Sequence, residues 1–293
     1  MKRITDVLLL GSLVVGSFGM AAAQEQPMSP PKVLTVTREF VKPGKGGAVH
    51  DKAESAFVQA FARAKWPTHY LAMNSLSGKP RVLFFTGYDS FEAWEKDTNA
   101  ANKNAALSGA LDRASAADGE LLDSMDQGAW AYREDYSLRA PVDIPHMRYF
   151  DISIFHVKQG HRKDWDDAVK MVLAAYQKAV PEAHWACYQG AYGVPEGAYV
   201  FITPRKSADE IDRSFTQDKQ FETAMGEEGM KKLEELSAAA IESSESNLFM
   251  FNPKMSYVAD DWVKADPDFW KPKPASIPAA VPKKPAEKPS AGQ

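Results

Sequence analysis

Alternating and helical hydrophobic patterns follow one another in the same order twice along this chain. Residues 33–41 and 149–157 alternate apolar and polar side chains, which is typical of strands. After Gly44 and Gly160, apolar residues recur at the spacing of one helical face. Two short apolar runs with a Gly- and Pro-containing turn between them then predict a hairpin in each copy.

Each copy ends with a longer amphipathic pattern and a short aromatic run. The pattern predicts a helix carrying Leu107, Leu111, Leu121, Leu122 and Met125 in the first copy, and Phe221, Met225, Leu233, Leu236 and Ile241 in the second. Aromatic strands at residues 130–132 and 249–251 follow these helices. The order is therefore β-α-β-β-α-β. A repeat this long indicates duplication of a whole unit, because solenoid repeats span about 20–50 residues.

One such unit has helices on one face of its sheet, and its other face needs a cover. A second copy in the same chain provides that cover, so we expect an α+β fold in which two tandem βαββαβ units form one barrel with helices outside. We expect the chain to be a monomer. The predicted segments are a signal peptide at 1–23, a first repeat at 32–140, a second repeat at 146–258 and a disordered tail at 264–293.

The two ends of the chain predict export and an unfolded extension. Lys2 and Arg3 precede an apolar stretch and Ala21-Ala22-Ala23, which together are typical of a cleavable secretory signal. The stretch is shorter than the roughly 20 residues of a bilayer span, so we expect a periplasmic or secreted protein that is not transmembrane. Residues 271–293 are rich in Pro, Ala and Lys. Their lysines suit contact with an anionic envelope surface, and a purely solubilising tail is the alternative.

Composition narrows the classes of function. The single cysteine, Cys187, forms no intramolecular disulfide, so the fold depends on its core. The formal net charge is −4, and an acidic body disfavours nucleic acid as a partner. The chain contains no HExxH, CxxC, EF-hand loop, phosphate-binding glycine loop or GxSxG, so we expect no metal site and no activated nucleophile.

Short motifs in the first copy resemble a known family. Residues 33–44, which end in Val-Lys-Pro-Gly, and residues 88–94 are similar to segments of the dimeric α/β-barrel (ferredoxin-like) superfamily, which includes NIPSNAP-like, EthD-like and antibiotic-biosynthesis-monooxygenase-like domains. The second copy departs from these motifs at Gln159 and at residues 208–211. The resemblance implies a tandem α/β barrel and a cofactor-free oxygenase-like or isomerase-like activity. It also implies haem as a minor alternative, with His156 or His184 as the axial ligand.

Four polar residues are the candidates for proton transfer. Glu39 and Asp151 lie within the first strand of each copy, where a carboxylate needs either a partner or a solvated cavity. His69 and His184 both precede the second strand, where imidazole suits a proton carrier at a pocket mouth. The alternatives are structural ion pairs for the acids and contacts with a helix C-terminus for the histidines.

Aromatic residues in the predicted strands suit a pocket for a flat or apolar ligand, but an ordinary barrel core is favoured for them, because strands are generally enriched in aromatics. The candidate ligand-binding residues are Tyr70, Trp130, Tyr132, Trp185, Tyr188 and Phe251. The remaining histidines, His50, His146 and His161, are expected at exposed positions. The leading hypothesis is an exported barrel that binds a small apolar or aromatic molecule between sheet and helices. The rival is a non-catalytic envelope scaffold or interaction protein.

Overall fold

The computed structural model describes residues 27–271 and shows two copies of one unit closed into an eight-stranded barrel. The elements of the first copy are β1 (Val33–Val41), α1 (Ala48–Ala64), β2 (Tyr70–Ser75), β3 (Arg81–Tyr88), α2 (Phe91–Lys103), α3 (Ala105–Gly119) and β4 (Leu122–Tyr132). Those of the second are β5 (Tyr149–Val157), α4 (Arg162–Ala179), β6 (Ala186–Tyr192), β7 (Ala198–Arg205), α5 (Asp209–Ala240) and β8 (Ile241–Phe251). The predicted α+β tandem-barrel fold is confirmed.

The barrel closes through two short ladders between the copies. Its strand order is β1-β3-β2-β8-β5-β7-β6-β4, and all neighbours are antiparallel. Strand β2 meets β8 from Met73↔Phe251 to Ser75↔Phe249, and β4 meets β6 up to Tyr132↔Tyr188. Because each sheet edge is paired with the other copy, neither half keeps a free edge in this ring.

Strand alternation sends one set of side chains into the barrel and the other set outward. The inner set is apolar and forms one continuous core, with Leu34, Val36, Leu71, Met73, Leu83, Phe85, Trp130, Phe150, Ile152, Tyr188, Val200, Ile202, Phe249 and Phe251 among its members. The space left at this core is a cavity of only about 40 Å³. The barrel interior is therefore a packed core rather than a binding chamber.

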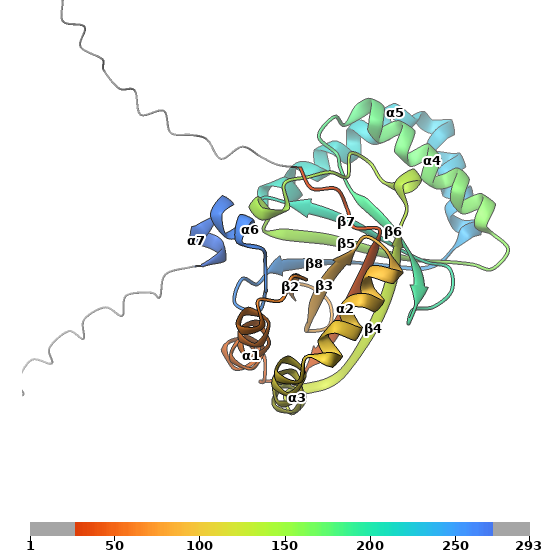
Figure 1. Ribbon diagram of the computed structural model, residues 1–293. Coiled ribbons are helices and arrows are strands. Elements are labelled where there is room, and N and C mark those ends of the chain that lie inside the picture. The colour runs from red at the N-terminus through yellow and green to blue at the C-terminus, as the bar shows by residue number, and fades with distance from the viewer. Residues whose placement is uncertain (1–26, 272–293) are drawn as a thin grey trace, which may run out of the picture.

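Helices cover the outer faces of the two sheets on opposite sides of the barrel (Figure 1). Helices α1, α2 and α3 lie beside the first sheet, and α4 and α5 lie beside the second. Helix α5 contains a break at Gly226, where φ is 67°, at the place where the first copy divides into α2 and α3. Glycine suits this position because a side chain would strain the left-handed backbone.

The strands that end each copy are much longer than the aromatic runs predicted. Leu122 and Met125, expected in a helix, lie in β4, and Ile241 begins β8; Leu121, also expected in the helix, follows the end of α3 at Gly119. The start of each strand is polar and exposed, so it lacks the alternating apolar positions that identify a strand. These residues are strands because they pair along the full length of β1 and β5.

A C-terminal segment docks on the barrel after β8. It contains α6 (Asp260–Ala265) and α7 (Pro267–Trp270), and Trp270 is buried near Phe251 and Trp262. The prediction of a disordered tail from residue 264 onward was therefore wrong for residues 264–271, because the buried side chain of Trp270 holds them against the core. The predicted signal peptide and the remainder of the tail lie outside the described residues. Within residues 27–271, no helix combines the length and apolar character that a membrane span requires.

Phe251 provides a test of the shared core. Its ring packs edge-on against Phe150 with centroids 4.7 Å apart, and its neighbour Met250 faces solvent. We expect Phe251→Ala to lower the free energy of unfolding by about 3–5 kcal/mol, because it leaves a cavity between the two sheets. Met250→Ala should change it by less than about 0.5 kcal/mol. Urea unfolding measures both, and similar losses for the two variants would contradict the assignment of Phe251 to the core.

Candidate functional site

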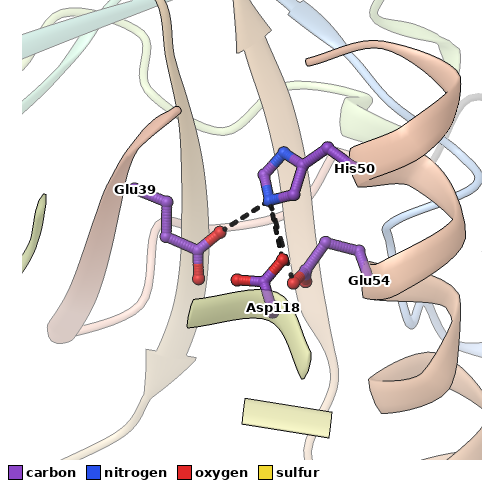
Figure 2. A group of neighbouring side chains, drawn as sticks. All are labelled: Glu39, His50, Glu54 and Asp118. Carbon is purple, nitrogen blue, oxygen red and sulfur yellow. Dashed lines mark ion pairs between the residues drawn. The ribbon is translucent and has the colours of Figure 1, made fainter. Parts of the chain in front are cut away.

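Four charged or titratable side chains meet in a buried cluster outside the first sheet. Glu39, His50, Glu54 and Asp118 converge there, and none is more than 6% exposed (Figure 2). The Nε2 atom of His50 lies 3.1 Å from Asp118 Oδ1, 3.2 Å from Glu39 Oε2 and 4.0 Å from Glu54 Oε1. One ligating atom from each side chain lies within 4.8 Å of all the others. We call this group the His50 cluster.

Three elements place the members of the His50 cluster. Glu39 is on the outer face of β1, opposite in parity to the core residues Leu34 and Val36. His50 and Glu54 are four residues apart on α1, so they lie one helical turn apart on the same face. Asp118 comes from the end of α3. The cluster therefore exists only when both helices are packed against β1.

The pKa values of three side chains in the His50 cluster are shifted from their ordinary values. Burial raises the pKa of Glu54 to about 9, and the neighbouring charges of Glu39 and Asp118 add to this shift. Burial also raises the pKa of Glu39, although the contact with His50 opposes the change. For His50, burial alone would lower the pKa, but the contacts with Asp118 and Glu39 outweigh it and raise the pKa to about 10. The surroundings therefore favour additional positive charge in the cluster.

Within residues 149–251, all of which the structure describes, the second copy has no counterpart of this cluster. Phe155, which holds the position in β5 that Glu39 holds in β1, packs its ring 5.4 Å from Trp165 of α4 and 5.6 Å from Phe201 of β7. The space between sheet and helices is also incompletely filled there. A cavity of about 700 Å³ lies among β5, β7, α4 and α5, and we call it the α4–α5 cavity.

One wall of the α4–α5 cavity is polar. Arg205 of β7 lies there with its side chain 13% exposed, and its guanidinium is 3.6 Å from the carboxylate of Asp151. The Nε atom of Arg205 is buried and has no hydrogen-bond partner. Ser153 and Ser246 share a hydrogen bond of 2.7 Å on the sheet floor. The cavity therefore combines an aromatic lining with a cation that has unused donor capacity.

The structure brings two of the four predicted proton-transfer residues into this cavity. Asp151 and His184 both line it. Both ring nitrogens of His184 contact backbone carbonyl oxygens, Nδ1 with Glu182 at 2.9 Å and Nε2 with Pro204 at 3.0 Å. Trp185 also lines the cavity and donates its indole N–H to the carbonyl oxygen of Tyr136 at 2.9 Å. His184 and Trp185 thus help to hold the cavity wall together.

The other predicted proton-transfer residues lie elsewhere. Glu39 belongs to the His50 cluster, and His69 lines a cavity of about 1150 Å³ at one end of the barrel. The ring of His69 stacks on Tyr257 with centroids 4.8 Å apart. Asp97, which lines this barrel-end cavity, accepts hydrogen bonds from Trp66, Thr68 and Tyr88, so the carboxylate of Asp97 already has partners.

The predicted ligand-binding aromatics are divided among several environments. Trp185 is in the α4–α5 cavity, whereas Trp130, Tyr188 and Phe251 are buried in the barrel core, where Tyr132 packs against them. Tyr70 packs among Phe61, Phe84 and Tyr257, and its hydroxyl is buried without a partner. Burial, followed by the charges of Glu54 and Glu39, raises the pKa of Tyr70.

Sequence reasoning missed three members of the His50 cluster. His50 was expected to be exposed, but it is 1% exposed. Glu54 and Asp118 were not singled out. A usable signal was present, because His50 and Glu54 share a helical face with Phe57 and Phe61. Asp118 gave no comparable local signal, since only the packing of α3 against α1 brings it into the group.

Comparison with solved structures finds chains that resemble this one in fold. An anthrone oxidase-like protein matches at a TM-score of 0.49 and 16% identity, covering 79% of this chain and 93% of that chain. A mutant chlorite dismutase from Candidatus Nitrospira defluvii, solved in complex with cyanide, matches at a TM-score of 0.43 and 9% identity, covering 77% and 92%. A provisionally named monooxygenase from Fusobacterium nucleatum matches at a TM-score of 0.48 and 12% identity, covering 76% and 94%.

These likenesses concern the fold alone. No protein-family model matches the chain, and no curated protein matches it either.

Replacing His50 tests whether the cluster depends on its central imidazole. We expect His50→Ala to lower the free energy of unfolding by about 3–5 kcal/mol, because three carboxyl groups remain buried without a cationic partner. The matched control is His161→Ala, whose side chain is 44% exposed and should leave the urea midpoint unchanged. A loss below about 1 kcal/mol for His50→Ala at pH 7 would show that the imidazole does not compensate these groups.

Proposed function

We propose that the protein binds a small aromatic or apolar molecule carrying an anionic group, and that the α4–α5 cavity is the binding site. The observation that supports this proposal is a cavity of about 700 Å³ with aromatic walls and the incompletely paired guanidinium of Arg205. Ligand pockets commonly measure about 300–1,000 Å³ and combine an apolar lining with a few polar groups that orient the ligand.

The lining defines the class of ligand. Phe155, Trp165 and Phe201 provide flat apolar surface, and such surface favours aromatic or planar apolar molecules. Two arginines line the cavity, and Arg213 is already paired with Asp209 and Glu210, so Arg205 is the cation available to a ligand. A guanidinium donates through a planar fork that matches a carboxylate or sulfonate, and the unpaired Nε of Arg205 leaves one of its donors available. An aromatic acid satisfies both features.

The barrel-end cavity is larger but offers less for an anionic ligand. Asp97, on its wall, is a carboxylate and already accepts three hydrogen bonds. His69 in the same wall is stacked on Tyr257, and burial lowers its pKa, which favours the neutral imidazole. Two lysines, Lys32 and Lys96, also line this cavity, but both are exposed and Lys96 is paired with Glu92. An exposed cation is screened by water, so it attracts an anion less than the enclosed guanidinium of Arg205. We therefore assign ligand binding to the α4–α5 cavity.

Catalysis by a cofactor-free, oxygenase-like route is the finer form of this proposal. Asp151 supports it, because it is a half-buried carboxylate that lines the cavity floor beside Arg205. In that role Asp151 would accept a proton from the bound molecule. His184 offers less, since both of its nitrogens face carbonyl oxygens. Binding without catalysis would preserve the same cavity.

Haem remains the minor alternative. His184 is the histidine that lines the α4–α5 cavity, and ligation of iron through Nε2 would require its contact with the carbonyl oxygen of Pro204 to break. His156 shares the inner-face parity of Ile152 on β5, on the opposite side of the sheet from the cavity-lining Phe155. Purification with haem supplied and an absorption scan for a Soret band separate this alternative from the leading proposal.

Export belongs to the proposal and rests on the residue pattern of the first 23 residues, which lie outside the described range. In the periplasm or outside the cell the protein would meet its ligand directly. The envelope-scaffold alternative needs no ligand. Mass spectrometry of small molecules that co-purify with the mature protein separates the two, because a scaffold should carry none.

Blocking the α4–α5 cavity tests its assignment. The probe is 8-anilinonaphthalene-1-sulfonate, an aromatic anion that fluoresces in apolar surroundings. We expect Val172→Trp, which fills the cavity, to lower probe affinity at least tenfold, because Val172 lines its wall. The matched control is Ala100→Trp, which introduces the same side chain into the barrel-end cavity and should leave binding unchanged. The reverse pattern would move the binding site to the barrel end.

Arg205 tests the charge of the ligand. We expect Arg205→Gln to weaken 8-anilinonaphthalene-1-sulfonate about tenfold, which corresponds to about 1.4 kcal/mol. The neutral analogue N-phenyl-1-naphthylamine lacks the sulfonate and should bind wild type and variant equally. Fluorescence titration measures both probes. Equal weakening of both probes would show that Arg205 shapes the cavity without selecting an anion.

A further inference from the structure

The His50 cluster has the geometry of a closed coordination site. Glu39, His50, Glu54 and Asp118 each present one ligating atom to a common point, and they come from β1, α1 and α3 (Figure 2). His50 Nε2 lies 3.1 and 3.2 Å from its two nearest oxygens. Atoms that each bind one cation at about 2.0–2.2 Å are separated by similar distances.

The four facing atoms also lack hydrogen-bond partners. Glu39 Oε2, His50 Nε2, Glu54 Oε1 and Asp118 Oδ1 are all buried, and none makes a hydrogen bond. The ring nitrogen is near two carboxylates but is not aligned to donate to either. Buried polar atoms normally make hydrogen bonds, so four atoms that face one another without any require an explanation. One cation between them would satisfy all four.

The charge balance also favours a cation. Three carboxyl groups surround one imidazole, and His50 is their only ion-pair partner among the described residues. No lysine or arginine within residues 27–271 makes an ion pair with Glu39, Glu54 or Asp118. Uncompensated buried charge is costly.

We propose that the His50 cluster binds one divalent transition-metal cation of the zinc or manganese type. One imidazole and three carboxylates form the ligand set, and this mixture of nitrogen and oxygen favours Zn²⁺, Mn²⁺ or Fe²⁺ over the all-oxygen sites of Ca²⁺ and Mg²⁺. The sequence alone had suggested no metal, because the ligands do not form a contiguous motif.

The site is structural rather than catalytic. All four ligands come from the protein, and all are at most 6% exposed, so no coordination position is open to substrate. Its cation joins α1 and α3 to β1. The second copy has the Phe155 and Trp165 rings in the corresponding layer, so we expect one cation per chain. This proposal is independent of ligand binding in the α4–α5 cavity.

Metal uptake by the tag-free mature protein tests the proposal. After dialysis against a chelator, the protein is titrated separately with Zn²⁺, Mn²⁺, Co²⁺, Ca²⁺ and Mg²⁺. Elemental analysis after desalting should find one Zn²⁺ per chain, and the melting temperature should rise with the concentration of free Zn²⁺. Co²⁺ should give visible d–d absorption that Zn²⁺ abolishes. No retained metal and no change in melting temperature would overturn the site, and preferential retention of Ca²⁺ or Mg²⁺ would overturn its chemical class.

The variant Glu54→Gln tests the ligand set, because it keeps the side-chain shape and removes one anionic oxygen. We expect at least a tenfold loss of Zn²⁺ affinity and an altered Co²⁺ spectrum. The matched control is Glu92→Gln on α2, whose side chain is 69% exposed and should bind Zn²⁺ like wild type. Equal affinity in all three proteins would place the metal elsewhere. If Glu54→Gln fails to fold, Asp118→Asn provides the same test, because it also removes one anionic oxygen from the ligand set.

Discussion

The two sheets must cover each other, and every other feature of this protein depends on that constraint. Each copy places large apolar side chains on one sheet face, such as Phe85 in the first copy and Phe150 in the second, whose rings lie 5.8 Å apart. Burial of that face against the other copy is the main source of stability. The ladders between copies are short, so hydrogen bonds alone do not hold the halves together. Side-chain packing inside the barrel therefore provides most of the free energy that holds the two copies together.

Because side chains fill the barrel interior, the candidate sites lie in the layers between each sheet and its helices. A core with a cavity of only about 40 Å³ has no room for a ligand. The space between each sheet and its helices is different, because helices pack against a sheet at a distance set by the side chains between them. In the first copy this layer holds the His50 cluster, and in the second it holds the α4–α5 cavity.

Duplication allowed these two layers to diverge without disturbing the barrel. Glu39 and Phe155 hold the same position in β1 and β5, and both point away from the shared core. A change there alters the layer under the helices and leaves the inner face intact. One copy consequently has a polar, closed site that joins its helices to the sheet, while the other has aromatic walls around open space.

Local patterns were sufficient to recognise the duplicated unit, because alternation and helical spacing are properties of neighbouring residues. The closed barrel was then predicted because each unit leaves one sheet face that the other unit must cover. Local patterns did not predict the polar first halves of β4 and β8, which form strands because they pair with β1 and β5 despite their lack of alternating apolar residues. Asp151 and His184 were identified and share a cavity, but their distances to other groups depend on how α4 and α5 pack. Only the tertiary structure brings Asp118 to Glu39 and His50, because contact between residues far apart in sequence is decided by packing and leaves no periodic signal.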